Sequence, residues 1–143
     1  MKIVVTTDFS PESRRAFPVA QDWAGRPGAE LILLHVAPDP QVLPGGTPLA
    51  SPLPAPSPQV ELADSKVHPA EVQKELGEHV RCEARVASNV PQAVADFVRK
   101  EGADFVVLAT HGRSGLRRMV LGSVAEQILR RVHVPVVCVP PQE

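Results

Sequence analysis

The chain has 143 residues, 43% hydrophobic and 22% charged, which is ordinary for a globular protein large enough to bury a core. Its net charge of −1 offers no general attraction to nucleic acid or anionic membranes, and aromatic residues, at 3%, are too few for base-stacking platforms. No run is apolar and long enough for a signal peptide or a membrane span, so we expect a cytoplasmic protein that binds neither nucleic acid nor membranes.

Five segments are predicted to be strands. KIVVTT at Lys2–Thr7 is a β-branched run with little polar alternation, as expected of a strand covered on both faces. ELILLHV at 30–36 is a second buried strand, and three more follow at Arg81–Ala87, 104–109 and 134–139. Pro135 favours a strand start or a sheet edge for the last of them.

The first helix is predicted over residues 12–24, which carry apolar residues at helical spacing. Ser10 is a candidate N-cap ahead of Pro11, and Gly25 is a candidate stop. Pro18 lies deep enough to predict a kink or an irregular first turn.

Helices are also predicted at about 90–100, with a stop at Gly102, and at Ser123–Arg131. Residues 59–79 look helical as well, but Pro69 predicts a short or broken helix there.

Residues 38–58 hold half of the sixteen prolines. Such a stretch predicts an extended surface loop, either an inert insertion or a PxxP-type ligand. Cys82 and Cys138 are interpreted as two buried thiols, and the scattered histidines predict no metal site. His35 and His111 are interpreted as hydrogen-bonded structural groups, because no nucleophile with an acid partner is identifiable and we assign no catalytic residue.

Strands alternating with helices predict a doubly wound α/β sheet with parallel strands and right-handed crossovers. Ligands of such folds bind beyond the carboxyl ends of the strands. Neither a P-loop nor a dinucleotide fingerprint occurs, so the candidate site is the loop-to-helix segment from Ala109 to Ser123.

That segment combines three features that suit an anion. Gly112 and Gly115 permit a sharp turn and a close backbone approach. Gly122 and Ser123 open a helix whose N-terminus favours negative charge. The loop also carries arginines that could neutralise a polyphosphate, namely Arg113, Arg117 and Arg118.

A second interpretation of the same segment needs no ligand. Ser123 and Glu126 form a capping-box pattern, in which they satisfy the helix's own end. Gly112 and Gly115 would then be turn residues, and the arginines a solvated surface. The two interpretations are compatible.

The segment resembles the C-terminal signature of the universal stress protein family. The ATP-binding branch has a glycine, two residues, a glycine, nine residues and then Gly-Ser or Gly-Thr. Here nine residues separate Gly112 from Gly122-Ser123, whereas Ala109 replaces the first glycine. KIVVTTDFSPES, LILLHV and HVPVVCVP extend the resemblance over the whole chain. We therefore expect one doubly wound domain over 1–143, with five parallel strands in the order 3-2-1-4-5.

The resemblance implies a site for ATP or another adenine nucleotide. Thr7 and Asp8 would lie by the adenine and ribose, and the backbone of Val36 would contact the base. The loop and the helix start would hold the ribose and phosphates. The expected nucleotide-binding residues are Thr7, Asp8, Val36, Ala109, Gly112, Arg113, Ser114, Gly115, Gly122, Ser123 and Val124.

Three hypotheses follow for function. The leading one is an ATP-binding regulatory protein of the stress response, in which occupancy orders the loop from Arg113 to Leu121 and changes a partner surface. Mg²⁺ would be held mainly by phosphates and water, with Asp8 as the clearest carboxylate. The alternatives are a slow ATP hydrolase or phosphoryl or adenylyl transferase, and a ligand-free dimeric interaction module. The resemblance also implies a homodimer through the last strand, from Val134 to Val139.

Overall fold

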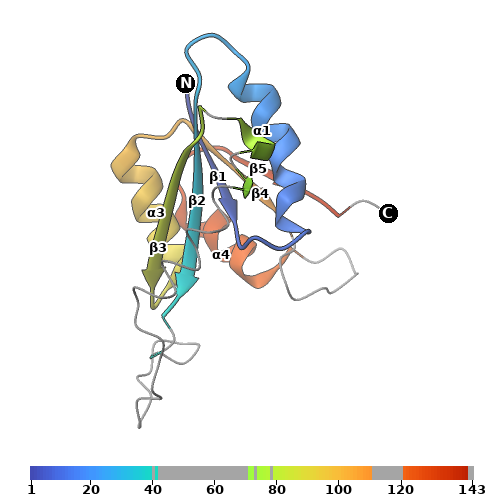
Figure 1. Cartoon of the computed structure of the whole chain (residues 1–143). Coiled ribbons are helices and arrows are strands. Elements are labelled where there is room, and N and C mark those ends of the chain that lie inside the picture. Colours follow the sequence, from blue (N-terminus) through green and yellow to red (C-terminus); the bar gives the residue numbers. More distant parts are fainter. Residues whose placement is uncertain (40, 42–70, 73, 78, 111–120, 142–143) are drawn as a thin grey trace.

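A computed structural model describes residues 1–39, 41, 71–72, 74–77, 79–110 and 121–141. Five parallel strands form one sheet in the order β3-β2-β1-β4-β5, which confirms the predicted fold class and strand order (Figure 1). The strands are β1 (Lys2–Thr7), β2 (Glu30–Pro38), β3 (Arg81–Ala87), β4 (Phe105–Ala109) and β5 (Val136–Val139).

Helices cover both faces of the sheet (Figure 1). One core contains α1 (Ala16–Ala24), with Phe17 fully inside, and the helical residues Val72 and Leu76. The other core contains α3 (Val90–Glu101) and α4 (Ser123–Arg131). Because successive side chains of a strand point to opposite faces, Ile3 and Val5 of β1 pack into the first core and Val4 into the second.

Two strands have ends that differ from the predicted ones: β2 ends later and β5 begins later. β2 continues to Pro38, two residues beyond the prediction, because β3 pairs with it as far as Ala87. β5 begins at Val136, immediately after Pro135, and pairs only with β4 within the described residues. The prediction that Pro135 marks a strand start at a sheet edge is confirmed.

The first predicted helix is divided in two. A 3₁₀ turn, η1 (Ser13–Arg15), precedes α1, so the α-helix begins four residues later than predicted. Pro18 is therefore the third residue of α1, where the missing N–H is one that the helix would not have used. The irregular first turn that Pro18 predicts is confirmed.

The two cysteines are less buried than predicted. Cys82 and Cys138 are half-buried, not fully buried, and burial raises the pKa of each thiol.

Two predicted segments cannot be compared with the structure over their full length. Residues 42–58 of the proline-rich stretch lie outside the described part of the chain, as do residues 59–70 of the predicted broken helix. None of the helices in the described ranges has the length and apolar character needed to cross a bilayer.

An ion-pair network joins β1, β2, β3 and α3 at the amino-terminal edge of the sheet. Arg81 hydrogen-bonds Glu101, and its guanidinium lies 3.6 Å from Glu30. The Lys2 ammonium lies 3.7 Å from Glu101 and 3.8 Å from Glu30. The hydrogen bond from Arg81 holds the pKa of the Glu101 carboxyl below its ordinary value.

Gly102 and Gly25 provide a matched test of backbone strain after a helix. Gly102 follows α3 with φ +61°, whereas Gly25 follows α1 with φ −66°. We expect Gly102→Ala to reduce the free energy of unfolding by about 1 kcal/mol, because alanine is strained in the left-handed region. Gly25→Ala should leave stability unchanged or slightly higher, and urea unfolding of both variants measures the difference. Equal effects would contradict the assignment of strain.

The Glu101 carboxylate should make stability depend on pH. Because its folded-state pKa is lowered, its stabilising contribution is present above the unfolded-state pKa and is lost as pH falls through the folded-state value. Glu101→Gln should therefore be less stable than the wild type near pH 7, and the two should converge in acid. Thermal unfolding across pH measures this, with exposed Glu71→Gln as the control outside the network. A difference that persists unchanged into acid would refute the pairing.

Candidate functional site

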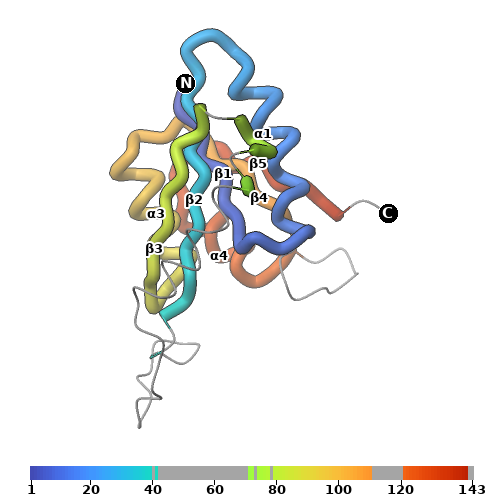
Figure 2. Tube along the Cα trace, viewed as in Figure 1, coloured from blue at the N-terminus to red at the C-terminus, as the bar shows by residue number. Residues whose placement is uncertain are grey.

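The carboxyl ends of the strands bring the predicted site residues to one edge of the sheet. Thr7 of β1 pairs in register with His35 of β2. Val5 pairs with Val107, so two residues further along Thr7 is level with Ala109 of β4. Figure 2 lets the chain be followed from the end of β1 into α1 at the edge where α4 begins.

Asp8 lies in a tight turn directly after β1. Its Oδ1 accepts hydrogen bonds from the backbone N–H of Ser10 at 3.0 Å and from the Ser10 hydroxyl at 2.5 Å. The Ser10 oxygen in turn accepts the N–H of Ser13, the first residue of η1, at 3.1 Å. The N-cap is Glu12 for η1 and Arg15 for α1, so the prediction of Ser10 as the N-cap is wrong. Ser10 instead accepts the N–H of Ser13 and orients Asp8.

Thr7 is buried beneath this turn, at 7% exposure. Its hydroxyl lies 2.9 Å from that of Ser13 and accepts the N–H of Phe9 at 2.9 Å. The Thr7 carbonyl accepts a hydrogen bond from Nδ1 of His35 at 2.8 Å, and the His35 ring packs on Phe9 with centroids 4.5 Å apart. The structural role predicted for His35 is confirmed.

The Val36 side chain belongs to the hydrophobic core, with 8% exposure. Any contact that Val36 makes to a ligand at this edge must therefore come from its backbone. Ala109 ends β4 half-buried, where it pairs with Val139 of β5. Its methyl group packs against the core that contains α1.

Thr110 anchors both ends of the predicted phosphate loop. Its N–H donates to the carbonyl of Val139 at 2.9 Å, and its carbonyl accepts the N–H of Gly122 at 2.8 Å. Thr110 thus holds the end of β4, the end of β5 and the start of α4 together. These contacts place the first turn of α4 at the carboxyl edge of the sheet.

The predicted capping box is wrong. Gly122, and not Ser123, is the N-cap of α4, because its carbonyl accepts the first helical hydrogen bond from the N–H of Glu126 at 2.8 Å. Glu126 accepts hydrogen bonds from Arg130 through its side chain. No side chain in the described residues caps α4, and Ser123 and Val124 are exposed.

Gly112, Arg113, Ser114 and Gly115, together with His111, Arg117 and Arg118, lie outside the described residues. The structure therefore brings together the parts of the predicted site contributed by β1, β2, β4 and α4. Among the described residues, no group of three or more His, Cys, Asp or Glu side chains is placed to hold a metal ion.

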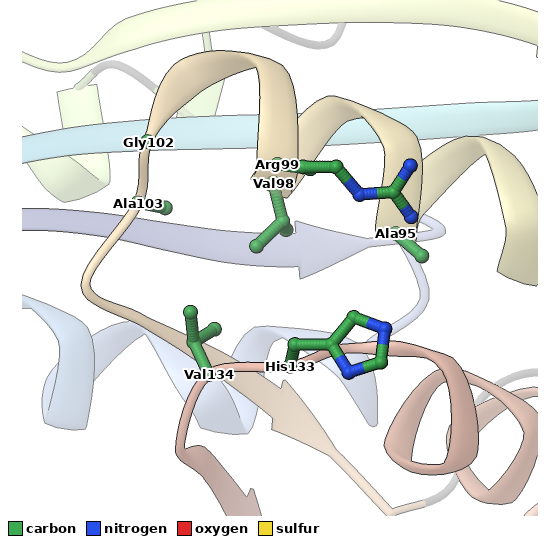
Figure 3. Close-up of a pocket in the computed structure, with 7 residues that line it drawn as sticks. All are labelled: Ala95, Val98, Arg99, Gly102, Ala103, His133 and Val134. Carbon is green, nitrogen blue, oxygen red and sulfur yellow. The ribbon is translucent and has the colours of Figure 1, made fainter.

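A separate cavity of about 220 Å³ lies between the end of α3 and the chain that enters β5 (Figure 3). It is lined by Ala95, Val98, Arg99, Gly102, Ala103, His133 and Val134. These residues belong to the amino-terminal side of the sheet, away from Asp8 and Gly122. The cavity is smaller than the about 300–1,000 Å³ of typical ligand pockets and its walls are almost entirely apolar, so it does not suit a nucleotide.

The sequence has relatives in one described family. A sequence model of the universal stress protein family matches residues 1–140. The chain belongs to the universal stress protein family. Universal stress protein Rv2005c of Mycobacterium tuberculosis is 34% identical over 146 residues, covering 94% of this chain and 44% of that protein. Universal stress protein MJ0531 of Methanocaldococcus jannaschii is 38% identical over 61 residues, covering 42% of this chain and 36% of that protein. The matches thus span less than half the length of these curated relatives.

Solved structures of universal stress proteins share the fold. UspA from Lactobacillus plantarum superposes with a TM-score of 0.76 at 20% identity, covering 97% of each chain. An Archaeoglobus fulgidus protein in complex with dAMP gives a TM-score of 0.64 at 23% identity over 96% of each chain. A universal stress protein in complex with cAMP gives 0.64 at 24% identity, over 99% of this chain and 98% of that one.

Several residues of this edge were missed by the sequence reasoning. Phe9 adopts a positive φ of 61°, and Ser13 joins the buried hydroxyl cluster. The spacing of Asp8 and Ser10 is a known turn signal, because an aspartate often accepts the N–H two residues later. No local pattern predicts the role of Thr110, which depends on two segments distant in sequence.

Proposed function

We propose that this chain is an ATP-binding regulatory protein whose nucleotide lies at the carboxyl edge of the sheet. The observation that carries the proposal is the N-terminus of α4, where Gly122 is the N-cap, Thr110 holds the Gly122 N–H, and no side chain among the residues that the structure describes caps the helix. The first N–H groups of an α-helix have no partner within the helix and attract anions. The phosphates would lie there.

The adenosine half of the ligand would lie toward β1 and β2. Asp8 provides a carboxylate, which accepts hydrogen bonds from hydroxyl or amino groups of a nucleoside. Val36 would contribute its backbone, since its side chain is in the core. The structures of relatives with dAMP and cAMP support an adenine nucleotide as the ligand class.

The loop residues and a magnesium ion would complete the proposed site. Gly112, Arg113, Ser114 and Gly115 would complete the phosphate cradle, and residues 1–143 would act as one nucleotide-binding domain. Mg²⁺ would be bound mainly by phosphate oxygens and water. The role is binding rather than turnover, because no nucleophile with an activating base is assembled in the described residues of this edge.

The proposed protein is also a homodimer paired through β5. The carbonyl of Pro135 accepts the N–H of Val106 in β4, and the carbonyl of Val139 accepts the N–H of Thr110, which directly follows β4. Because the peptide groups of a strand point alternately to either side, the N–H groups of Val136 and Cys138 point away from β4. β5 therefore offers a second chain an edge for pairing.

Gly122→Asp is designed to separate helix capping from anion binding. The backbone at Gly122, with φ −57° and ψ 147°, accepts an L-residue, and aspartate is a favourable N-cap. Its carboxylate would repel phosphates, so ATP affinity should fall about tenfold below that of the neutral Gly122→Asn counterpart. Isothermal titration with ATP and AMP measures this, and the loss should be larger for ATP. Wild-type protein that gives no heat at millimolar ATP would refute nucleotide binding.

Val136→Pro tests the dimer without removing a hydrogen bond to β4. Proline would remove the outward N–H, and the wild-type dimer should become a monomer in size-exclusion chromatography with light scattering. Val136→Thr keeps the N–H and a β-branched side chain, so it should remain a dimer. A wild-type monomer, or a Val136→Pro dimer, would contradict the proposed pairing.

A further inference from the structure

The buried polar side chains of the described residues all lie under the turn that carries Asp8. They are Thr7, Ser10 and Ser13, with 7%, 6% and 6% exposure. Burying a hydroxyl is unfavourable unless it is hydrogen-bonded, and three together at one turn indicate that the turn's conformation depends on them.

The direction of each hydroxyl proton can be assigned. The Ser13 hydroxyl donates to the carbonyl of Ser10 at 2.9 Å, because a carbonyl can only accept. Its single proton is thereby used, so in the 2.9 Å contact between Thr7 and Ser13 the donor is Thr7. Thr7 also accepts the N–H of Phe9. The Thr7 proton points into the protein and is not directed to a ligand.

The Ser10 hydroxyl proton is assigned in the same way. It donates to Oδ1 of Asp8, while the Ser10 oxygen accepts the N–H of Ser13. Together with the Ser10 N–H, this places two donors on one carboxylate oxygen of Asp8. The carboxylate is thus held in one rotamer by Ser10.

Phe9 shows that the turn is strained. An aromatic residue at φ 61° is a backbone outlier, and such outliers persist only where the surroundings determine the conformation. Here the Thr7 hydroxyl accepts the Phe9 N–H, and the His35 ring packs on Phe9 while bonded to the Thr7 carbonyl. Phe9 immediately follows Asp8, so the contacts that hold Phe9 also fix the backbone at Asp8.

We infer that Thr7, Ser10 and Ser13 are positioning residues that orient the Asp8 carboxylate toward the ligand, and that the Thr7 hydroxyl does not itself bind the ligand. This inference rests on the proposed nucleotide binding. Its physical basis is preorganisation: an aspartate already held in its binding rotamer loses no side-chain freedom when the nucleotide arrives. The Thr7 hydroxyl, predicted to contact the ligand, is thus assigned a supporting role beneath Asp8.

A double-mutant cycle tests the inference by isothermal titration with ATP. The proteins are wild type, Ser10→Ala, Asp8→Asn and the double variant. Ser10→Ala should weaken ATP binding roughly five- to tenfold, since the carboxylate regains rotamer freedom. In the Asp8→Asn background the same change should have little further effect, because Ser10 acts through Asp8. Exposed Ser88→Ala is the matched control and should bind as the wild type does.

The outcomes separate this inference from the proposed function. If wild type binds ATP and Ser10→Ala binds equally well, the positioning role is overturned and nucleotide binding stands. An equal loss in both backgrounds, or no effect of Asp8→Asn, also overturns it, since Ser10 would then not act through Asp8. Failure of the wild type to bind overturns both. If Ser10→Ala does not fold by circular dichroism, Ser13→Ala is used in the same cycle, with a smaller loss expected.

Discussion

The pairing of β1 with β2 on one side and β4 on the other is the interaction on which the rest of the structure depends. Ile3, Val4 and Val5 are fully buried, and they contribute to the cores on both faces of the sheet. The same pairing aligns the ends of the three strands. It therefore fixes the core and the position of the site together, because a shift in register would bury Asp8 or expose Ile3.

The two edges of the sheet differ in what satisfies their polar groups. At the amino edge, charged side chains pair with one another, as in the network of Lys2, Arg81 and Glu101. At the carboxyl edge, hydroxyls and backbone groups satisfy one another, and no side chain of the described ranges caps the N-terminus of α4. The carboxyl edge is thus the one that has donors to offer an anion. The cavity at the end of α3 is lined mainly by apolar groups, with Arg99 and His133 beside it.

Two sets of hydrogen bonds support the candidate site, one at Asp8 and one at Thr110. Ser10 orients Asp8 through two hydrogen bonds, and Thr110 joins the two ends of the loop to the sheet. In the proposed function, the nucleotide would lie between these two supports on neighbouring strands.

Much of this architecture is determined locally. The apolar runs of β1 and β4 and the stop at Gly102 are features of short stretches. The predicted helices at 90–100 and Ser123–Arg131 agree closely with α3 and α4. The spacing of Gly112 and Gly122 and the resemblance that it carries also come from sequence alone.

Tertiary structure decided the details that depend on partners distant in the chain. β2 extends to Pro38 because β3 pairs with it, and the N–H of Gly122, the N-cap of α4, is held by Thr110 at the end of β4. The sequence by itself determined the fold, and placed Asp8 and the start of α4 at one edge of the sheet. Only the folded chain decided that Thr7 is buried and that Asp8 is oriented by Ser10, because hydrogen-bond directions depend on which groups the sheet brings together.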